Sequence, residues 1–333
     1  MTAVNLGSGS NVLVDVLDVG HGSCAVVLDG QSTLVIDTGV KSYLLEYLAE
    51  AGRTSIDALI ISHADSDHLR GLVALLGAGI DIKHMYWNTD SVKGSQLWRS
   101  VVFELNARMK TGQSVQHHDA IQGRRIHVAH AQATIEVVSP DLEINRLGPG
   151  QTDSSGDLIT SNSASVVARI DINGSPFVLA TGDLDEVGWR HLVASGRSVR
   201  AEYLIAPHHG GRVAVGAAQP AVSAAILAAV RPSAVVISNG RTAYANPRHD
   251  VIQALKLAPT RPYIACTQLS ERCSNMASST GPVSTLMSAG HARGHSCAGT
   301  VRLRFGLKQD PAEFSRSDHQ SFITTEAPTA LCR

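Results

Sequence analysis

The feature that most constrains this chain is a group of four metal-binding side chains directly after an apolar segment. Residues 56–62 read "IDALIIS", the pattern of a buried strand, and residues 63–68 read "HADSDH". In α/β proteins the carboxyl end of a strand faces the crevice where chemistry takes place. Two imidazoles and two carboxylates packed this closely need a common partner, and a divalent cation is one. The segment therefore predicts a metal site at a strand end.

The spacing of the four side chains favours two ions. His63 and Asp65 are expected to point to one side of the segment, and Asp67 and His68 to the other. The alternative is a solvated loop in which acids and histidines occur by chance. A cluster of four such groups favours the metal site over that alternative.

Composition limits the other possibilities. The 333 residues are 44% hydrophobic and 17% charged, which is ordinary globular composition, and with 4% aromatic residues the core must be aliphatic. The net charge of -1 gives no overall positive field, so binding to nucleic acid would need a local basic patch. Candidates for such a patch are Lys83, Lys93, Arg99, Arg108, Lys110, Arg124, Arg125 and Arg212.

No apolar run is long enough to span a bilayer, and the first residues lack the basic start and apolar middle of a secretion signal. We therefore expect a cytoplasmic protein that does not bind membranes. Four of its five cysteines lie in the last quarter of the chain. In a reducing compartment we expect all five to be free thiols or metal ligands in preference to disulfides.

Strand and helix patterns alternate along the chain, which predicts an α/β or α+β class with layered packing. Residues 42–52 and 95–110 have helical spacing, and residues 299–307 form the last predicted strand. Residues 141–163 are polar and rich in Gly, Ser and Asp, and we interpret them as a long surface loop that could lie over the active site. The tail from Gln309 carries no clear pattern and is expected to be frayed.

Several motifs, in order, resemble the metallo-β-lactamase superfamily. "HADSDH" is similar to the family signature His-x-His-x-Asp-His, with Asp65 in place of the second histidine, a variant typical of the branch resembling the hydrolase domain of ComEC-type DNA-uptake proteins and phosphorylcholine esterases. "LDVGHGS", "LVIDTG", "SNSAS", "LATGD" and "LIAPHHGG" resemble the other family segments. The resemblance covers about residues 12–258 and implies an αββα sandwich with the metal site at one edge.

The resemblance also implies roles for individual residues. One ion would be held by His63, Asp65 and a shared Asp183, and the other by Asp67, His68, Asp183 and a histidine of "PHHG". The family pattern Pro-x-His-Gly makes His209 that ligand, so His208 would touch the substrate, donate a proton or support the site. Asp37 would brace the metal loop. Asp18 and His21 could position water or substrate, or His21 could satisfy backbone groups in its turn. The candidate catalytic residues are Asp67, His208 and His21.

Two departures from the family pattern stand out. No histidine precedes the bridging aspartate as a third ligand to the first ion, so Asn162 or water must take that place. "YANPRH" has Asn246 where ComEC-like chains often carry a histidine, and His249 could substitute for it.

Cys266, Cys273, Cys297 and His295 could form a closed zinc site in the C-terminal segment. The alternatives are free buried thiols or a disulfide between Cys266 and Cys273.

The expected protein is a metal-dependent hydrolase with residues 1–258 as the hydrolase domain and residues 259–333 as an extension. Its cofactors would be two divalent ions, Zn²⁺, Mn²⁺ or Mg²⁺, and Asp65 shifts the preference towards Mn²⁺ or Mg²⁺ because it makes the site harder than an all-histidine one. A water that bridges two cations becomes a nucleophile near neutral pH, which suits a phosphodiesterase or nuclease. The alternatives are hydrolysis of a small phosphoester, cyclic nucleotide or lactone, and a binding protein whose metal site has decayed. The expected partners are therefore nucleic acid or a small phosphoester.

Overall fold

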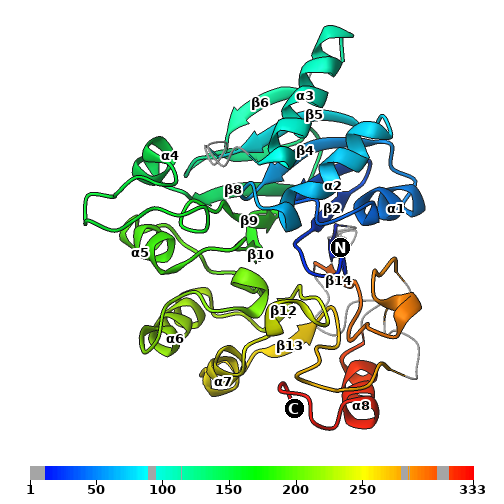
Figure 1. Cartoon of the computed structure of the whole chain (residues 1–333), viewed down its shortest axis with the longest axis vertical. Coiled ribbons are helices and arrows are strands. Elements are labelled where there is room, and N and C mark those ends of the chain that lie inside the picture. Colours follow the sequence, from blue (N-terminus) through cyan, green and yellow to red (C-terminus); the bar gives the residue numbers. More distant parts are fainter. Residues whose placement is uncertain (1–11, 89–94, 114, 279–283, 285, 306–314) are drawn as a thin grey trace, which may run out of the picture.

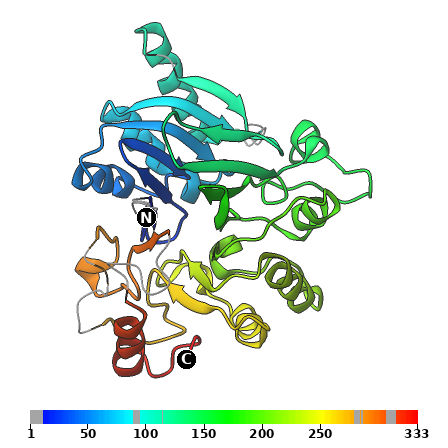
Figure 2. The same ribbon diagram turned by 180° about the vertical axis from the view of Figure 1, so that it is seen from behind.

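The computed structural model describes residues 12–88, 95–113, 115–278, 284, 286–305 and 315–333. Two seven-stranded mixed sheets make up its centre (Figures 1 and 2). The first sheet has the order β14 (Val301–Arg304), β1 (Leu13–Val16), β2 (Ala25–Asp29), β3 (Ser32–Ile36), β4 (Ser55–Ile61), β5 (Asp81–Trp87) and β6 (Gln116–Asp119). The second has the order β13 (Tyr263–Cys266), β12 (Ala234–Ile237), β11 (Tyr203–Ile205), β10 (Ser175–Ala180), β9 (Val167–Ile172), β8 (Ala133–Ser139) and β7 (Arg125–His127).

Helices cover the outer faces of both sheets (Figure 1). They are α1 (Tyr43–Glu50), α2 (Ser66–Gly77), α3 (Gln96–Lys110), α5 (Glu186–Ala194), α6 (Ala218–Val230), α7 (His249–Leu257) and α8 (Arg316–Glu326), whereas the short helix α4 (Leu142–Leu147) packs in a separate small cluster with Ile159 and Ala164. Among the described residues, no helix has the length and apolar character that crossing a membrane would require.

Strand β4 shows why the layers stack in this order. Successive side chains of a strand point to opposite faces. Ala58 and Ile60 therefore pack in the core between the sheets, whereas Leu59 and Ile61 pack in a second core beneath α1 and α2. A third core lies between the second sheet and helices α5 to α8. The predicted αββα sandwich is confirmed.

Parallel pairing places several loops at one edge of the sandwich. β3, β4 and β5 are parallel neighbours in the first sheet, as are β10, β11 and β12 in the second. Since the carboxyl ends of parallel strands meet at the same edge, the segments after β4, β10 and β11 can approach one another.

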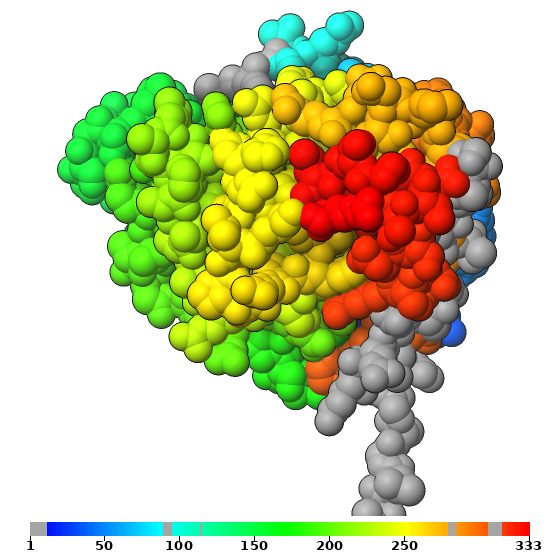
Figure 3. Space-filling model, turned by 90° about the horizontal axis from the view of Figure 1, so that it is seen from below, coloured from blue at the N-terminus to red at the C-terminus, as the bar shows by residue number. Residues whose placement is uncertain are grey.

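The C-terminal region contributes to both sheets. β13 pairs in parallel with β12, and β14 pairs antiparallel with β1. The tail that was expected to be frayed instead forms α8, whose Phe322 and Ile323 pack in the same core as Cys266. Seen from below, this C-terminal segment, in red, lies against the yellow part of the chain (Figure 3). The boundary at residue 258 stays a prediction.

The segment predicted as one long loop begins with helix α4, so that prediction is wrong for residues 142–147. The following residues are held on α5 by His191. Its Nδ1 lies 2.8 Å from Asp141 Oδ2 and its Nε2 lies 3.0 Å from Asp153 Oδ2. Arg190 adds a 2.9 Å contact to the Asp153 carboxylate. An imidazole between two carboxylates donates from both nitrogens, which requires the protonated ring.

The charges around His191 shift pKa values in opposite directions. Burial disfavours the imidazolium, but the hydrogen bonds to Asp153 and Asp141 outweigh that effect and raise the pKa of His191 above 6.5. The hydrogen bond from His191 is in turn the main reason why the pKa of Asp153 falls to about 2.

We predict that His191→Asn lowers the free energy of unfolding by about 1–3 kcal/mol at pH 6, the usual worth of hydrogen bonds to charged groups. Because the folded-state pKa of His191 is raised, its contribution is complete below pH 6.5 and is lost as the pH rises through that pKa. Urea unfolding at pH 6 and pH 9 should therefore show a smaller difference between variant and wild type at pH 9. His291→Asn, at an exposed histidine, is the control. A difference independent of pH would contradict the ion-pair explanation.

Candidate metal centre

The loop after β4 and the start of α2 present the first group of site residues. His63 follows the strand, Asp65 is the residue before the helix, and Asp67 and His68 lie in its first turn. The Asp65 side chain accepts no capping hydrogen bond from the helix. The partial positive charge at a helix N-terminus stabilises carboxylates placed there.

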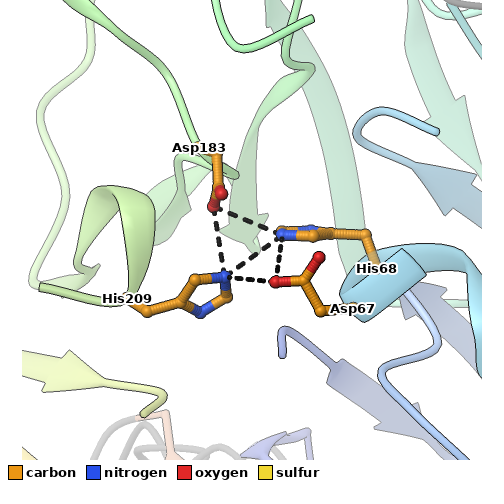
Figure 4. Close-up of side chains that lie close together, drawn as sticks. All are labelled: Asp67, His68, Asp183 and His209. Atoms are coloured by element: carbon orange, nitrogen blue, oxygen red, sulfur yellow. Dashed lines mark hydrogen bonds and ion pairs between the residues drawn. The ribbon is translucent and has the colours of Figure 1, made fainter. Parts of the chain in front are cut away.

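Four ligand atoms converge from three distant chain segments. Asp67, His68, Asp183 and His209 each offer one atom, and these atoms all lie within 4.8 Å of one another. Asp183 follows β10, and His209 belongs to the 3-10 helix Pro207–Gly210 that follows β11. Figure 4 shows the four side chains pointing toward a common centre. The structure thus brings together four of the six predicted metal ligands at coordinating range.

The distances within this cluster are short. His209 Nε2 lies 3.2 Å from Asp67 Oδ2 and 3.4 Å from Asp183 Oδ1. His68 Nε2 lies 3.3 Å from the same oxygen of Asp183 and 3.3 Å from His209 Nε2 (Figure 4).

Hydrogen bonds on the far side of each ring fix the tautomers of the two histidines. His68 Nδ1 lies 2.7 Å from Asp37 Oδ2, and His209 Nδ1 lies 2.9 Å from the Ser238 carbonyl oxygen. A carboxylate and a carbonyl only accept, so each Nδ1 carries a proton, and in the neutral ring each Nε2 directs its lone pair into the cluster. Four electron-pair donors then face one another, and a divalent cation is the partner that satisfies all four. The residues fit a metal ion.

The close contacts between carboxylates and imidazoles also shift the pKa values of the cluster residues. Burial disfavours the charged form of His68, yet the carboxylates of Asp183 and Asp37 raise its pKa well above the usual range. Burial likewise opposes ionisation of Asp183, but His209 and His68 hold its pKa well below the usual range.

His63 and Asp65 form a looser group beside the cluster. His63 Nε2 lies 3.8 Å from Asp65 Oδ2 and 4.0 Å from Asp183 Oδ2. His208 Nε2 approaches that Asp183 oxygen from the solvent side, at 3.8 Å. Within the described ranges no three ligand atoms here come as close together as those of the main cluster.

Ser165 is a site residue that the sequence analysis missed. Its Oγ accepts a hydrogen bond from the Asp183 backbone N at 3.2 Å and lies 3.3 Å from His63 Nδ1. Asn162, the predicted substitute ligand, is not among the residues that line the metal cleft. The serine is the last residue of the quoted "SNSAS" segment, where it matches the serine of the family's Asn-x-x-Ser pattern, but that resemblance assigned it no contact.

Asp37 is buried and organises the metal loop, as the family resemblance implies. Besides binding His68, its carboxylate accepts from the Ser62 backbone N at 2.7 Å and from Ser62 Oγ at 2.8 Å. Its backbone is left-handed, with φ of 60°. A single carboxylate therefore fixes both the start of the loop and the orientation of a metal-facing imidazole.

The turn after β1 places His21 at the cluster. His21 Nε2 lies 3.5 Å from Asp67 Oδ2, and its ring centroid lies 4.5 Å from that of His209. Burial and the neighbouring His209 lower the pKa of His21 to about 4. The idea that Asp18 positions water or substrate is wrong, because its buried carboxylate instead accepts from the Gly20 and Gly290 backbone N–H groups and from Gln268.

The cluster opens into a cleft of about 450 Å³. The residues that line it are His21, Asp65, Asp67, Asp183, His208, Gly211, Arg212, Tyr244, Asn246 and Arg248. Asn246, expected to stand in a ligand position, donates to the His208 carbonyl oxygen at 3.2 Å. His249 lines a separate hollow between α6 and α7, so it does not substitute for the missing histidine.

Three of the eight basic residues proposed as a nucleic-acid patch are engaged elsewhere. Arg108 is buried and donates to the Ile80 carbonyl oxygen, Lys83 pairs with Asp57, and Arg125 pairs with Glu136. Lys93 lies outside the described residues. Of the proposed set, Arg212 lines the metal cleft.

The structure contradicts the predicted zinc site in the C-terminal segment. Cys266, Cys273 and Cys297 pack in the apolar core of the second sheet. His295 is separate from them, and burial together with the nearby Arg241 and Arg293 lowers its pKa. Cys297 Sγ instead contacts His319 Nε2 at 3.2 Å. In the part of the chain that the structure covers, the metal centre is the one place where three or more ligand atoms gather.

Comparison with known proteins agrees with this geometry. The model of the family described as "Metallo-beta-lactamase superfamily" matches residues 17–240. The chain belongs to this superfamily. The predicted membership is therefore confirmed.

Two curated relatives connect this superfamily member to the ComEC type. It is 25% identical over 274 residues to ComE operon protein 3 of Bacillus subtilis (strain 168), a match that covers 73% of this chain and 30% of that protein. It is 28% identical over 244 residues to competence protein ComA of Neisseria gonorrhoeae, covering 72% of this chain and 28% of that protein. The chain thus spans less than a third of the length of either relative.

Solved structures of similar fold include YhfI from Bacillus subtilis, a metallo-beta-lactamase fold protein. It is 12% identical with a TM-score of 0.47, covering 77% of this chain and 96% of that one. Another is Tm1679, a metal-dependent hydrolase of the beta-lactamase superfamily, 14% identical with a TM-score of 0.49 and the same two coverages of 77% and 96%.

We predict that Asp37→Asn weakens metal binding by about 10- to 100-fold, the usual effect of losing a hydrogen-bonding partner behind a ligand histidine. The amide keeps the shape of the side chain but removes the charge that orients His68. Calorimetric titration of the metal-free protein with Mn²⁺ and Zn²⁺ measures the change, and Asp318→Asn, an exposed site on α8, is the control. Unchanged metal affinity in a folded Asp37 variant would show that the hydrogen bond from His68 to Asp37 does not affect metal binding.

Proposed function

We propose that this chain is a binuclear metal-dependent phosphodiesterase that cleaves nucleic acid. The observation that carries the proposal is the convergence of four ligand atoms on a cleft whose rim bears Arg212 and Arg248. The name of one relative, competence protein ComA, and the resemblance to ComEC-type hydrolases support a nucleic-acid substrate. Membership of the superfamily and the gathered ligands weigh against a decayed metal site.

The two proposed ions have different protein environments. Asp67, His68, Asp183 and His209 would hold one of them. His63, Asp65 and the second Asp183 oxygen would hold the other, with His208 at its open side. Divalent ions bound here supply a more acidic water and offset the negative charge that develops on phosphate oxygens. We propose Mn²⁺, Zn²⁺ or Mg²⁺, with the acidic donor set favouring the harder ions.

The protein residues have their own tasks in this proposal. Asp67 binds a cation and keeps His209 and His21 in position through contacts of 3.2 Å and 3.5 Å. His208 is partly exposed at the mouth of the cleft, where it can donate a proton to the leaving oxygen. His21 is uncharged near neutral pH and contributes its shape and hydrogen bonding rather than charge.

A small phosphoester or cyclic nucleotide is the second candidate substrate. The cleft volume of about 450 Å³ lies within the range of ordinary small-molecule sites. The protein's overall charge of -1 also gives no general attraction for a polyanion.

We predict that the metal-stripped protein is inactive and that added Mn²⁺ restores cleavage of single- or double-stranded oligonucleotides. Asp67→Ala should reduce the rate by about 10²- to 10⁴-fold, because it removes a ligand whose ion supplies several kcal/mol of transition-state stabilisation. Gel analysis of end-labelled oligonucleotides, run beside cyclic nucleotides and a lactone, measures the specificity.

Asp81→Ala, at an exposed carboxylate on β5, is the matched control and should behave as wild type. Equal activity in the Asp67 variant would identify a contaminating nuclease. Turnover of the cyclic nucleotide without oligonucleotide cleavage would replace the first proposal by the second.

A further inference from the structure

One wall of the metal cleft carries an exposed aromatic ring on an unusual backbone. Tyr244 is 77% exposed and lies in the 3-10 helix Ala243–Ala245. Its φ of 52° and the φ of 52° at Ala245 are left-handed, a conformation that costs about 1–2 kcal/mol for a residue with a side chain. A solvent-exposed tyrosine recovers little of that cost through packing. Such backbone outliers are found preferentially at ligand-binding sites.

The Tyr244 ring is anchored on the metal centre by His21. The two ring centroids are 4.7 Å apart with an interplanar angle of 39°. His21 in turn contacts His209 and Asp67. The phenol ring therefore stands one imidazole away from the metal ligands, with most of its surface open to a ligand in the cleft.

Two guanidinium groups lie on the same wall. Arg212 Nε donates to Asp250 Oδ2 at 2.7 Å, which fixes that side chain at the rim. Arg248 also lines the cleft, and no carboxylate oxygen of the described residues lies within 4.0 Å of its guanidinium nitrogens, the limit for an ion pair. A guanidinium at a cleft without an acidic partner suits a bidentate contact with phosphate.

We propose that Tyr244 and Arg248 form a recognition site for one nucleotide beside the metal centre, in which the phenol ring stacks on a base and the guanidinium binds the adjoining phosphate. This inference rests on the proposed nuclease function. It specifies which part of the substrate Tyr244 and Arg248 bind. Because every base has a π-face, stacking of this kind tolerates sequence variation.

The wall does not suit the main alternative ligand of an aromatic residue, a quaternary ammonium group. Recognition of such a cation uses a ring face in a site that lacks competing positive charge. Here Arg248, which makes no ion pair with the described residues, lines the same cleft as Tyr244 and would repel it. The same guanidinium attracts a phosphodiester, so its charge favours a nucleotide over a choline-like headgroup.

The experiment uses the full chain with Mn²⁺ and two single-stranded oligonucleotides of equal length, one natural and one with abasic sites at every position. Tyr244→Leu should raise KM for the natural strand by about 5- to 150-fold, the loss expected from 1–3 kcal/mol of stacking. Tyr244→Phe should stay within about twofold of wild type, because the ring is kept. On the abasic strand, wild type and Tyr244→Leu should be equal.

Arg248→Ala gives an independent measure of the phosphate contact. Binding of a labelled strand, followed by fluorescence anisotropy at several salt concentrations, should weaken, and the slope of log affinity against log salt should fall by about 0.7. Phe103→Leu on α3 is the control for loss of an exposed aromatic ring, since Phe103 is 70% exposed and absent from the cleft lining.

The outcomes separate this inference from the function on which it rests. Cleavage of natural and abasic strands at equal efficiency, with Tyr244→Leu as active as wild type, would overturn the stacking site and leave the nuclease proposal standing. Equal losses in Tyr244→Phe and Tyr244→Leu would assign the effect to the hydroxyl and also overturn it. A wild-type protein that binds Mn²⁺ but cleaves no oligonucleotide would overturn both.

Discussion

The site depends on four groups that, when both imidazoles are neutral, are electron-pair donors and cannot satisfy one another. The carboxylates of Asp67 and Asp183 only accept hydrogen bonds, and the Nε2 atoms of His68 and His209 face them as acceptors because their Nδ1 protons are already bound. Burying such a set without a counter-charge is costly. A cation makes the arrangement favourable, so the chain's folding at this edge and its capacity to bind metal are two aspects of the same interaction.

The double sheet explains how residues far apart in the sequence reach this point. His68 lies in the first turn of α2, which follows a parallel strand of the first sheet, while Asp183 and His209 follow strands of the second. The turn after β1 closes the arrangement. A Cβ at Gly22 would lie 2.5 Å from the Asp67 backbone oxygen, so only glycine permits the approach. The Ser23 N–H then donates to that oxygen at 3.2 Å, which ties the turn to the metal loop.

The sequence was sufficient to predict the superfamily, the sandwich and the residues gathered at the centre. These predictions depend on local patterns, a buried strand followed by "HADSDH" and later "TGD" and "PHHG", whose order along the chain is visible without a structure. Helix α8 was missed because its polar sequence is buried mainly through Phe322 and Ile323, too few residues to give a helical period.

Features that depend on long-range geometry could not be predicted in the same way. Tyr244 and Arg248 reach the cleft because a short 3-10 turn bends the chain after β12, and no periodic pattern marks that bend. Asp18 has the position of a catalytic acid in the sequence, yet segments about 250 residues later use its carboxylate as a structural acceptor. The role of a polar residue depends on which distant groups lie next to it in the folded chain. Local sequence patterns do not reveal those neighbours.

The two halves of the proposed binuclear centre are unequal, and the difference begins in residues 160–165. Where the superfamily pattern implies a further histidine, this chain has hydroxyl side chains. Ser165 orients His63 and Asp183, while Ser163 Oγ donates to Asp185 at 2.8 Å. The segment therefore positions ligands instead of adding one. With Asp65 in place of a histidine, the side near His63 is richer in carboxylate oxygens, which suits hard cations that keep several waters. Positions that water would fill on an ion bound there are the ones that a substrate oxygen could take, so the proposed function places the substrate on this looser half.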